Sequence, residues 1–390
     1  MRRTLNTTML RRQIARQLGN PMARIERRLA QHNEWWLFGL IGLLLALGIA
    51  NLMSATHPES EALLTPTVKR QCFALLLGLL GFAGAIAIDY RRFERWAPFL
   101  YIGSLGLLVA TLVVGTMTHG NQSWLVLGPL RLQPSELARV AMILMLARYF
   151  HRNPPSEVRR LRDLFVPGLI VATTVGLIVL GRDMGVAVLT IAVAATYLVF
   201  VRIPIRSWAV VAGTALAVLA IIWFFVLADY QKSRILDVAD PGRDPLASGY
   251  QANQSRIAIG SGGLFGKGYM EGTQTQLRFL PTQHTDFIFS VLAEEWGLVG
   301  AASVLVLYFS LLVWGLVIAR GSKDLFGALL AVGVVGMLFW PAVVNVLMVT
   351  GLAPVIGVPL PLFSYGGSSL LASLIALGLL LNVSLRRYLF

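Results

Sequence analysis

The feature that most constrains this chain is a series of apolar runs, most of them close to the length of a membrane crossing, separated by hinges that carry most of the charge. A helix needs about 20 apolar residues to cross the hydrocarbon core of a bilayer, because every backbone donor and acceptor must be satisfied within the segment. Composition agrees, since 56% of the residues are hydrophobic and 13% are charged, whereas soluble domains are roughly a quarter charged. The sequence predicts an all-α, polytopic membrane protein with about ten transmembrane helices.

The apolar runs give the approximate bounds of the expected spans. They cover about 35–53, 71–88, 97–116, 134–150, 164–180, 185–201, a run that ends near 228, and 300–318, 325–349 and 367–383. The connection from about 229 to 296 is far longer than ordinary connections, and structureless connections of that length are uncommon unless they are functional.

Charge sets the expected orientation. The net charge is +14, but the basic residues recur at the ends of apolar runs and form no basic and aromatic patch, so nucleic acid is not an expected partner. Every short hinge expected inside is basic, which predicts that both termini are cytoplasmic and that the long loop faces outward. Residues 1–34 form an arginine-rich cytoplasmic tail ahead of a membrane domain at 35–386. The tail either binds lipid headgroups or a partner, or only fixes topology.

Few residues have the pattern of a metal or redox site. Cys72 is the only cysteine, so no intrachain disulfide is possible, and the five histidines show no metal-ligand spacing. We therefore predict no metal ligands in the chain.

Polar residues interrupt apolar sequence at two outward-facing helix starts. Glu136 and Arg139 are three residues apart after Pro134, so they share one helix face at membrane depth, where ionisable groups usually face a polar cavity. The alternative is an ion pair that only holds the short helix. Asp183 precedes the next span, where it either caps the helix or acts in a site, and Arg182 beside it could bind an anion.

The segment at 351–369 is too rich in Gly and Pro to be helical throughout. Irregular backbone near membrane depth is tolerated only where protein or a cavity surrounds it. Ser364, Gly366 and Gly367 come just before the last span, and a helix start of this kind can bind an anion.

The long loop carries the cations Arg256, Lys267 and Arg278 around the glycine-rich turn GSGGLFGKG. Such glycines would let the backbone approach a ligand, and the cations could hold a diphosphate. The turn lacks the GK[ST] ending of a phosphate-binding P-loop. The alternative is that these cations are simply solvated.

Asp286 is the main candidate for chemistry. It follows Thr285 at the boundary between the polar loop and the apolar run FIFSVLA, where partial desolvation raises a carboxylate's pKa and nearby arginines lower it. A general base needs such tuning. The alternative is an acid in the first turn of a helix capped by Thr285.

The strings FLPTQHTDFIFSVLAEEWG, YQANQSRIAIGSGGLFGKG and GVPLPLFSYGGSS closely resemble the SEDS family (shape, elongation, division and sporulation). GTQTQLRFLP and GVPLPLFSYGG are more similar to its rod-shape branch than to its division branch. The resemblance runs from the first span to the C-terminus and leaves out the arginine-rich tail.

The resemblance implies a peptidoglycan glycosyltransferase of the bacterial inner membrane. Such proteins polymerise lipid II, a disaccharide-pentapeptide on undecaprenyl diphosphate, with a class B penicillin-binding protein as transpeptidase partner and the elongation machinery around them. By similarity, Asp286 matches the essential loop aspartate, and Glu136, Arg139 and Asp183 match residues that line a central polar cavity.

Three positions depart from the family pattern. GRDMGV replaces QPDxGT around Asp183, Ser123 stands where a basic residue often precedes Trp, and Arg139 replaces Lys. The phosphate contact of that basic residue is either absent from this chain or supplied by Arg131 or Arg182.

We expect an inverting glycosyl transfer with Asp286 as general base. Arg139, Lys267 and Arg278 are the candidates to stabilise the leaving diphosphate, and a divalent cation such as Mg²⁺ could assist them. The rivals are a lipid II flippase, a scaffold that recruits a penicillin-binding protein, and a division-type member of the family.

Overall fold

The computed structural model describes residues 34–57, 64–118, 121–127, 130–154, 160–201, 205–221, 224, 229–239 and 249–386. Contacts divide the chain into two units, Met1–Leu43 and Leu44–Phe390. The described part of the first unit is the beginning of one helix. The predicted basic tail, residues 1–34, lies outside the described residues except for Glu34.

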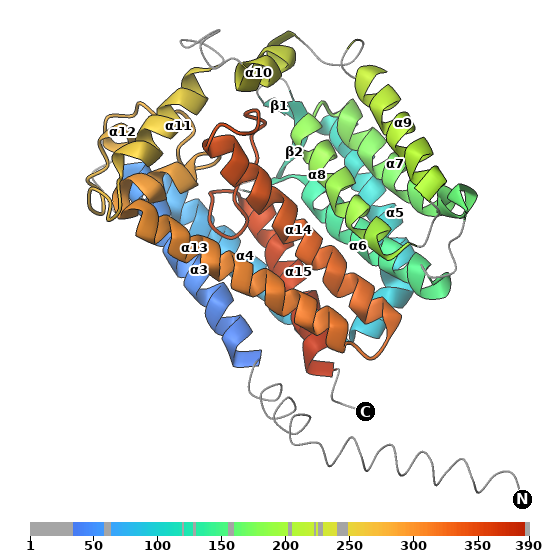
Figure 1. The fold of residues 1–390 in the computed structure, drawn as a ribbon. Helices are drawn as coiled ribbons and strands as arrows, with labels where there is room; N and C mark the ends of the chain where they lie inside the picture. The colour runs from blue at the N-terminus through green and yellow to red at the C-terminus, as the bar shows by residue number, and fades with distance from the viewer. Residues whose placement is uncertain are drawn as a thin grey trace, which may run out of the picture. The chain divides into compact units, whose positions relative to one another are not determined.

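The described part of the chain is mainly helical, as Figure 1 shows. The helices are α3 (Glu34–Thr56), α4 (Pro66–Ala87), α5 (Tyr90–Val114), α6 (Pro134–Arg152), α7 (Phe165–Leu180), α8 (Met184–Ala195), α9 (Ile205–Ile221), α10 (Asp229–Ala239), α11 (Tyr250–Ser261), α12 (Thr273–Gln276), α13 (Ile288–Gly321), α14 (Leu325–Val349) and α15 (Gly367–Arg386), with the 3-10 helices η3 (Leu161–Leu164) and η4 (Thr196–Phe200).

Every predicted span has a helix at its position, and the predicted fold class is confirmed. Among the described residues, seven helical stretches are long and apolar enough to cross a membrane: α3, α4, α5, η3 with α7, α13, α14 and α15. The other spans correspond to α6, which carries charged residues, and to α9 and α8 with η4, which are shorter. The protein is therefore a multi-pass membrane protein.

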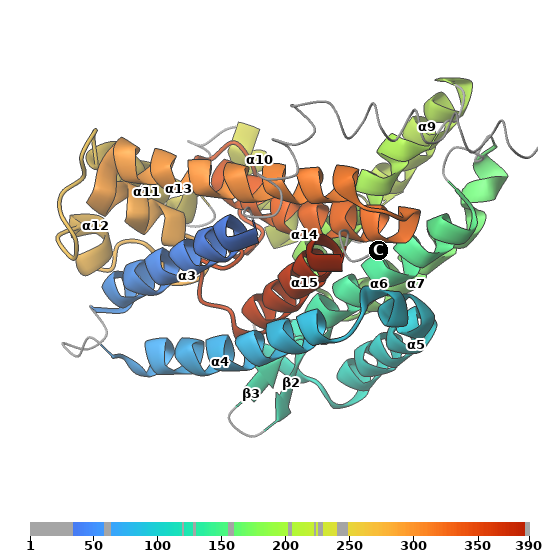
Figure 2. The same ribbon diagram turned by 90° about the horizontal axis from the view of Figure 1, so that it is seen from below.

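Helices α14 and α15 are the most buried of these seven stretches. α15 packs along α4, and α14 contacts α6, α8, α13 and α15 (Figures 1 and 2). Small residues allow the closest approach, because a Cβ at Gly78 of α4 would lie 2.5 Å from Leu374 Cδ1 of α15.

A small antiparallel sheet follows α5, in the order β1 (Thr116–Thr118), β2 (Asn121–Leu127) and β3 (Leu130–Leu132). Met117 pairs with Gln122, and Leu125 with Leu132. The sequence predicted no element between the expected spans at 97–116 and 134–150.

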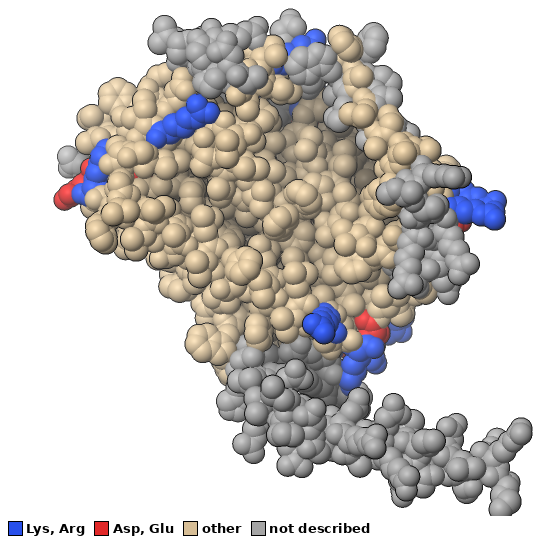
Figure 3. All heavy atoms as spheres, in the orientation of Figure 1, with Lys and Arg blue, Asp and Glu red and all other residues tan. Residues whose placement is uncertain are grey.

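The charged side chains are distributed as expected for a protein in a membrane. On the face drawn in Figure 3, the charged side chains of the described residues lie towards the rim, and a broad uncharged field lies between them. An uncharged middle matches contact with hydrocarbon.

Helix α13 begins ahead of the expected eighth span, which was placed at about 300–318. α13 begins at Ile288 and contains a break at Gly297, where φ is 65° and ψ is −164°. Residues 288–296 form the first segment of α13, which is buried from Ile288 to Glu295. The apolar run FIFSVLA that follows Asp286 in the sequence supplies most of this segment.

The glycine-rich turn forms hydrogen bonds with α13 on both sides of this break. The backbone N–H groups of Lys267 and Gly268 donate to the carbonyl oxygens of Glu294 and Glu295, both at 3.1 Å. After the break, Leu298 N–H donates to Gly263 O (2.9 Å) and Val299 N–H to Leu264 O (3.1 Å). These bonds satisfy groups that the interrupted helix leaves unpaired.

The glycines are needed for this contact. A Cβ at Gly262 would lie 2.0 Å from Ala293 O, and one at Gly266 would lie 2.0 Å from Glu295 O. At Gly262 and Gly266 the backbone of the turn therefore approaches the backbone of α13. The predicted approach of this turn to a ligand stays a prediction.

Candidate active site

Asp286 lies in the turn just before α13. Its backbone N–H donates to Thr282 O (3.2 Å), and its carbonyl oxygen accepts a hydrogen bond from Asn345 Nδ2 (2.8 Å). Asn345 is fully buried on α14, and Nδ2 also donates to Val358 O (2.7 Å). One side-chain amide therefore fixes the turn of Asp286 to the segment that follows α14.

The alternative of a first-turn acid capped by Thr285 is wrong. The N-cap of α13 is Phe287, which makes no side-chain capping bond, and Asp286 precedes it. The Thr285 hydroxyl instead donates to Thr282 O (3.2 Å). The carboxylate of Asp286 is thus outside the helix and available for another role.

The surroundings of Asp286 tune its acidity. The residue is partly buried, and a Cβ placed at Gly357 would lie 3.6 Å from Asp286 Oδ2, so the carboxylate faces the Gly- and Pro-rich segment. Burial raises the pKa of Asp286 to about 6, against a hydrogen bond from Thr285 and the charge of Arg234, which lower it. A carboxylate with this pKa is ionised at pH 7 and more basic than an exposed aspartate.

Arg234 is a residue that the sequence analysis missed. It lies on α10, its Nη1 donates to Val355 O (2.9 Å), and its charge acts on Asp286. α10 is amphipathic and polar, so the sequence alone indicates that its arginine is a solvated cation of the loop. Only the fold brings it near a residue 52 positions later.

A second cluster forms around Asp183. Asp183 is the N-cap of α8, as the capping alternative predicted, with Oδ1 accepting from Val186 N–H (3.3 Å) and Oδ2 from Gln133 Nε2 (2.7 Å). Burial raises the pKa of Asp183, while these bonds, the charge of Arg139 and a bond from Ser123 oppose the rise. The Ser123 position that departs from the family pattern therefore contacts Asp183.

Glu136 and Arg139 pair on one face of α6, as predicted, and both are buried. They line a recess with residues of α8, α14, α15 and the Gly- and Pro-rich segment: Leu189, Met337, Pro341, Val358, Pro359, Pro361, Ser369 and Ser373. Val358 links this recess to the turn of Asp286, because Asn345 Nδ2 donates to the carbonyl oxygens of both Val358 and Asp286. The structure thus connects Asp286 with the cluster of Glu136, Arg139 and Asp183.

Lys267 lies in a different environment. Its Nζ donates to Oε1 of the fully buried Glu294 (2.7 Å) and to Thr273 Oγ1 (2.8 Å). Glu294 also accepts the backbone N–H groups of Gln274 (2.8 Å) and Thr275 (3.1 Å), at the start of α12. Lys267 is therefore paired, and it could bind another anion only with the loss of this ion pair. Its predicted contact with a diphosphate stays a prediction.

Arg278 is exposed, with a left-handed φ of 59°, and its predicted contact with a diphosphate also stays a prediction.

Residues of the string SYGGSS form hydrogen bonds with other residues of the chain. Ser364 Oγ accepts from Leu360 N–H (2.9 Å), and Gly366 N–H donates to Gln71 Oε1 (3.1 Å).

Gly367 begins α15, where an added Cβ would lie 3.3 Å from Ala74 Cβ. Together with the bonds that Gln71 of α4 accepts from Gly366 N–H and donates to Ser364 O, this contact holds the segment against α4. The predicted anion contacts of Ser364, Gly366 and Gly367 stay predictions.

No group of three or more His, Cys, Asp or Glu side chains in the described ranges is placed to hold a metal ion. The predicted assistance from a divalent cation such as Mg²⁺ stays a prediction.

The family of cell cycle proteins FtsW, RodA and SpoVE matches residues 34–389. The chain belongs to this family. The match confirms the resemblance inferred from the motifs, and it begins where the arginine-rich tail ends.

Individual members of the family support the assignment. The chain is 43% identical over 329 residues to the peptidoglycan glycosyltransferase MrdB of Escherichia coli K12, covering 82% of this chain and 86% of that protein. It is similar to a chain of a solved peptidoglycan synthase complex that coordinates polymerization and crosslinking (TM-score 0.76, 38% identity, 91% and 98% coverage). It is also similar to the rod shape determining protein RodA of Thermus thermophilus (TM-score 0.68, 36% identity, 91% and 97% coverage).

Proposed function

We propose that this family member is a peptidoglycan glycosyltransferase that polymerises lipid II into glycan strands. The observation that carries the proposal is the partly buried carboxylate of Asp286, with a pKa raised to about 6, held at the outer end of a membrane bundle by a buried amide. A membrane fold is needed because both substrates carry prenyl chains, which apolar surfaces between helices can hold.

The reaction is an inverting glycosyl transfer. The GlcNAc 4-hydroxyl oxygen of the acceptor attacks the anomeric carbon of the donor MurNAc, forming the new C–O bond as the bond to the lipid diphosphate breaks. Asp286 accepts the hydroxyl proton and later releases it to water. A carboxylate is a weak base towards an alcohol, so proton transfer is concerted with departure of the diphosphate.

Cations have to stabilise the negative charge that develops on the diphosphate. Arg139 contributes through the buried cluster with Glu136, and Lys267 and Arg278 remain candidates. A divalent cation such as Mg²⁺, brought by the phosphates of the substrate, would supply further positive charge at the leaving group.

The cellular setting follows from the same reasoning. The protein lies in the bacterial cytoplasmic membrane with both termini inside, because the basic hinges favour that side. Its likeness to a peptidoglycan synthase complex supports a class B penicillin-binding protein as partner. Its likeness to MrdB and RodA supports a task in elongation and cell shape, with division as the alternative.

The test is polymerisation of lipid II by the purified protein, reconstituted with its partner, comparing the native chain with Asp286→Asn. Loss of the base should reduce the rate by roughly 100- to 10,000-fold while lipid II still binds. Equal polymerisation by both would overturn the role of Asp286. Translocation of lipid II without polymer would favour a flippase, and neither activity would favour a scaffold.

A further inference from the structure

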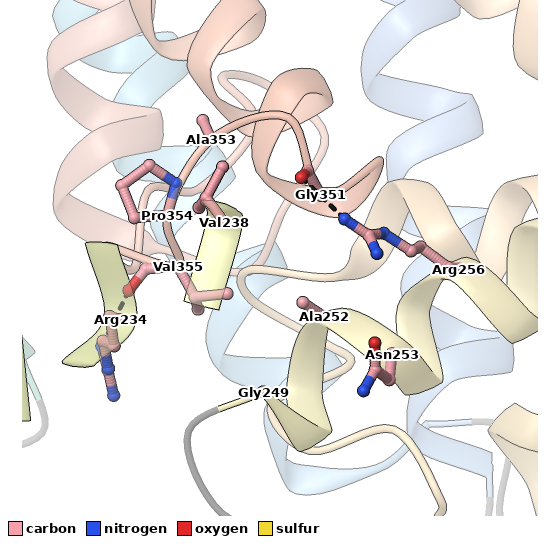
Figure 4. Close-up of a pocket in the computed structure, with 10 residues that line it drawn as sticks. All are labelled: Arg234, Val238, Gly249, Ala252, Asn253, Arg256, Gly351, Ala353, Pro354 and Val355. Carbon is pink, nitrogen blue, oxygen red and sulfur yellow. Dashed lines mark hydrogen bonds between the residues drawn. The ribbon is translucent and has the colours of Figure 1, made fainter. Parts of the chain in front are cut away.

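A recess separate from the Glu136 cluster lies between α10, α11 and the turn that follows α14. Figure 4 shows two arginine side chains entering it from opposite sides, Arg234 from α10 and Arg256 from α11. The other lining residues are small, apolar or amide-bearing: Val238, Gly249, Ala252, Asn253, Gly351, Ala353, Pro354 and Val355. No carboxylate is among the described residues that line it.

Arg256 is held in the recess by neutral partners. Nε donates to Thr350 O (3.2 Å) and Nη2 to Gly351 O (2.8 Å). A guanidinium bound to carbonyl oxygens keeps its positive charge and retains other N–H donors. Gly351 makes this position possible, because a Cβ there would lie 2.1 Å from both Nε and Nη2 of Arg256.

Arg234 connects the recess with the candidate base. Its Nη1 donates to Val355 O (2.9 Å), two residues before Gly357, which faces the Asp286 carboxylate. The charge of Arg234 also acts on Asp286 directly. The recess is therefore next to the turn in which the proposed reaction takes place.

A third source of positive potential is the N-terminus of α11. Gly249 is its N-cap and lines the recess, and the first turn of a helix carries unsatisfied N–H groups and the positive end of the dipole. Two guanidinium groups and a helix start around one recess favour a ligand that carries more than one negative charge.

We propose that this recess binds the diphosphate group of a lipid-linked substrate. The proposal rests on the proposed function, because the donor in that reaction carries a diphosphate on the sugar that is transferred, close to the general base Asp286. Arg139 is paired with Glu136, and Lys267 is paired with Glu294. Arg256, by contrast, donates to carbonyl oxygens. Arg256 is thus suited to the charge of the diphosphate, and Arg234 adds a second positive charge beside the recess.

The probe is inorganic pyrophosphate, titrated calorimetrically into the purified full-length protein in nanodiscs. Arg256→Gln should weaken binding about tenfold or more, because a charge-assisted bond is lost. Arg256→Lys should weaken it less, since the charge remains without the planar fork. Gly351→Ala should weaken it while leaving both arginines in the sequence. Arg91→Gln, an exposed arginine beside Asp324, is the matched control and should bind normally.

Thermal unfolding of each variant separates loss of binding from loss of folding, and Arg256→Lys retains a readout if Arg256→Gln unfolds. Equal binding by all variants, or no binding by the native chain, would overturn the site. Asp286→Asn should still bind pyrophosphate. Binding without polymerisation by the native chain would refute the proposed function and leave the site standing. Polymerisation with an unchanged KM in Arg256→Gln would refute the site alone.

Discussion

At the scale of single residues, the chemistry depends on opposing effects on Asp286. Burial raises its pKa, and the Thr285 hydroxyl and the Arg234 charge lower it, with a result of about 6. A general base must be deprotonated, so activity should rise as the pH increases through about 6.

Replacing Thr285 tests this balance. Thr285→Val removes a hydrogen bond that favours the charged carboxylate, so the pKa of Asp286 should rise further, by about one unit. The lower midpoint of the kcat/KM profile should shift to higher pH by the same amount. Thr285→Ser keeps the hydroxyl and should leave the midpoint in place. A shift to lower pH in Thr285→Val would contradict the assignment.

At the scale of elements, the first segment of α13 (residues 288–296) positions the site. It ends at the Gly297 break, and the glycine-rich turn satisfies the backbone groups on both sides of that break. Ser255 of α11 adds a bond to Ser290 Oγ (2.7 Å) and one to Val349 O (2.6 Å). The long loop is therefore joined to α13 and α14 by many specific hydrogen bonds.

Two glycines of this region form a matched pair of variants. A Cβ at Gly262 would lie 2.0 Å from a backbone oxygen of α13, whereas a Cβ at Gly260 would meet nothing within 4 Å. Gly262→Ala should destabilise the protein by about 2–3 kcal/mol through forced displacement of backbone. Gly260→Ala lies in α11 and should be neutral or stabilising by up to about 1 kcal/mol. Thermal unfolding in detergent measures both, and equal midpoints would contradict the docking of the turn.

At the scale of the whole molecule, the placement of charge determines how the chain lies in the membrane. Apolar helix faces that are exposed in the structure, such as Phe309 on α13 and Leu76 on α4, are compatible with lipid. The same exposure in water would be an aggregation hazard.

The orientation can be measured because Cys72 is the only cysteine. In a Cys72→Ser background, a membrane-impermeant maleimide added to intact cells stripped of their outer barrier should label Glu271→Cys, in the long loop, and spare Lys323→Cys, in the hinge before α14. Both positions are exposed in the structure, so access depends on the side of the membrane. Labelling of Lys323→Cys alone would reverse the proposed topology.

The sequence by itself determined the features that depend on near neighbours in the chain. The positions of the membrane helices follow from the length of apolar runs, because hydrocarbon offers the backbone no partners. The pair of Glu136 and Arg139 follows from helical spacing, and the cap at Asp183 follows from its place before α8.

Only the tertiary structure decided the features made by distant residues. The pairing of Lys267 with Glu294, the closure of the Gly297 break and the position of Arg234 near Asp286 join parts of the chain that no local pattern connects. A lysine in a glycine-rich loop has the same sequence whether it is solvated, paired or bound to a ligand. The partner is settled by packing, because a buried carboxylate must be matched by donors that the fold brings to it.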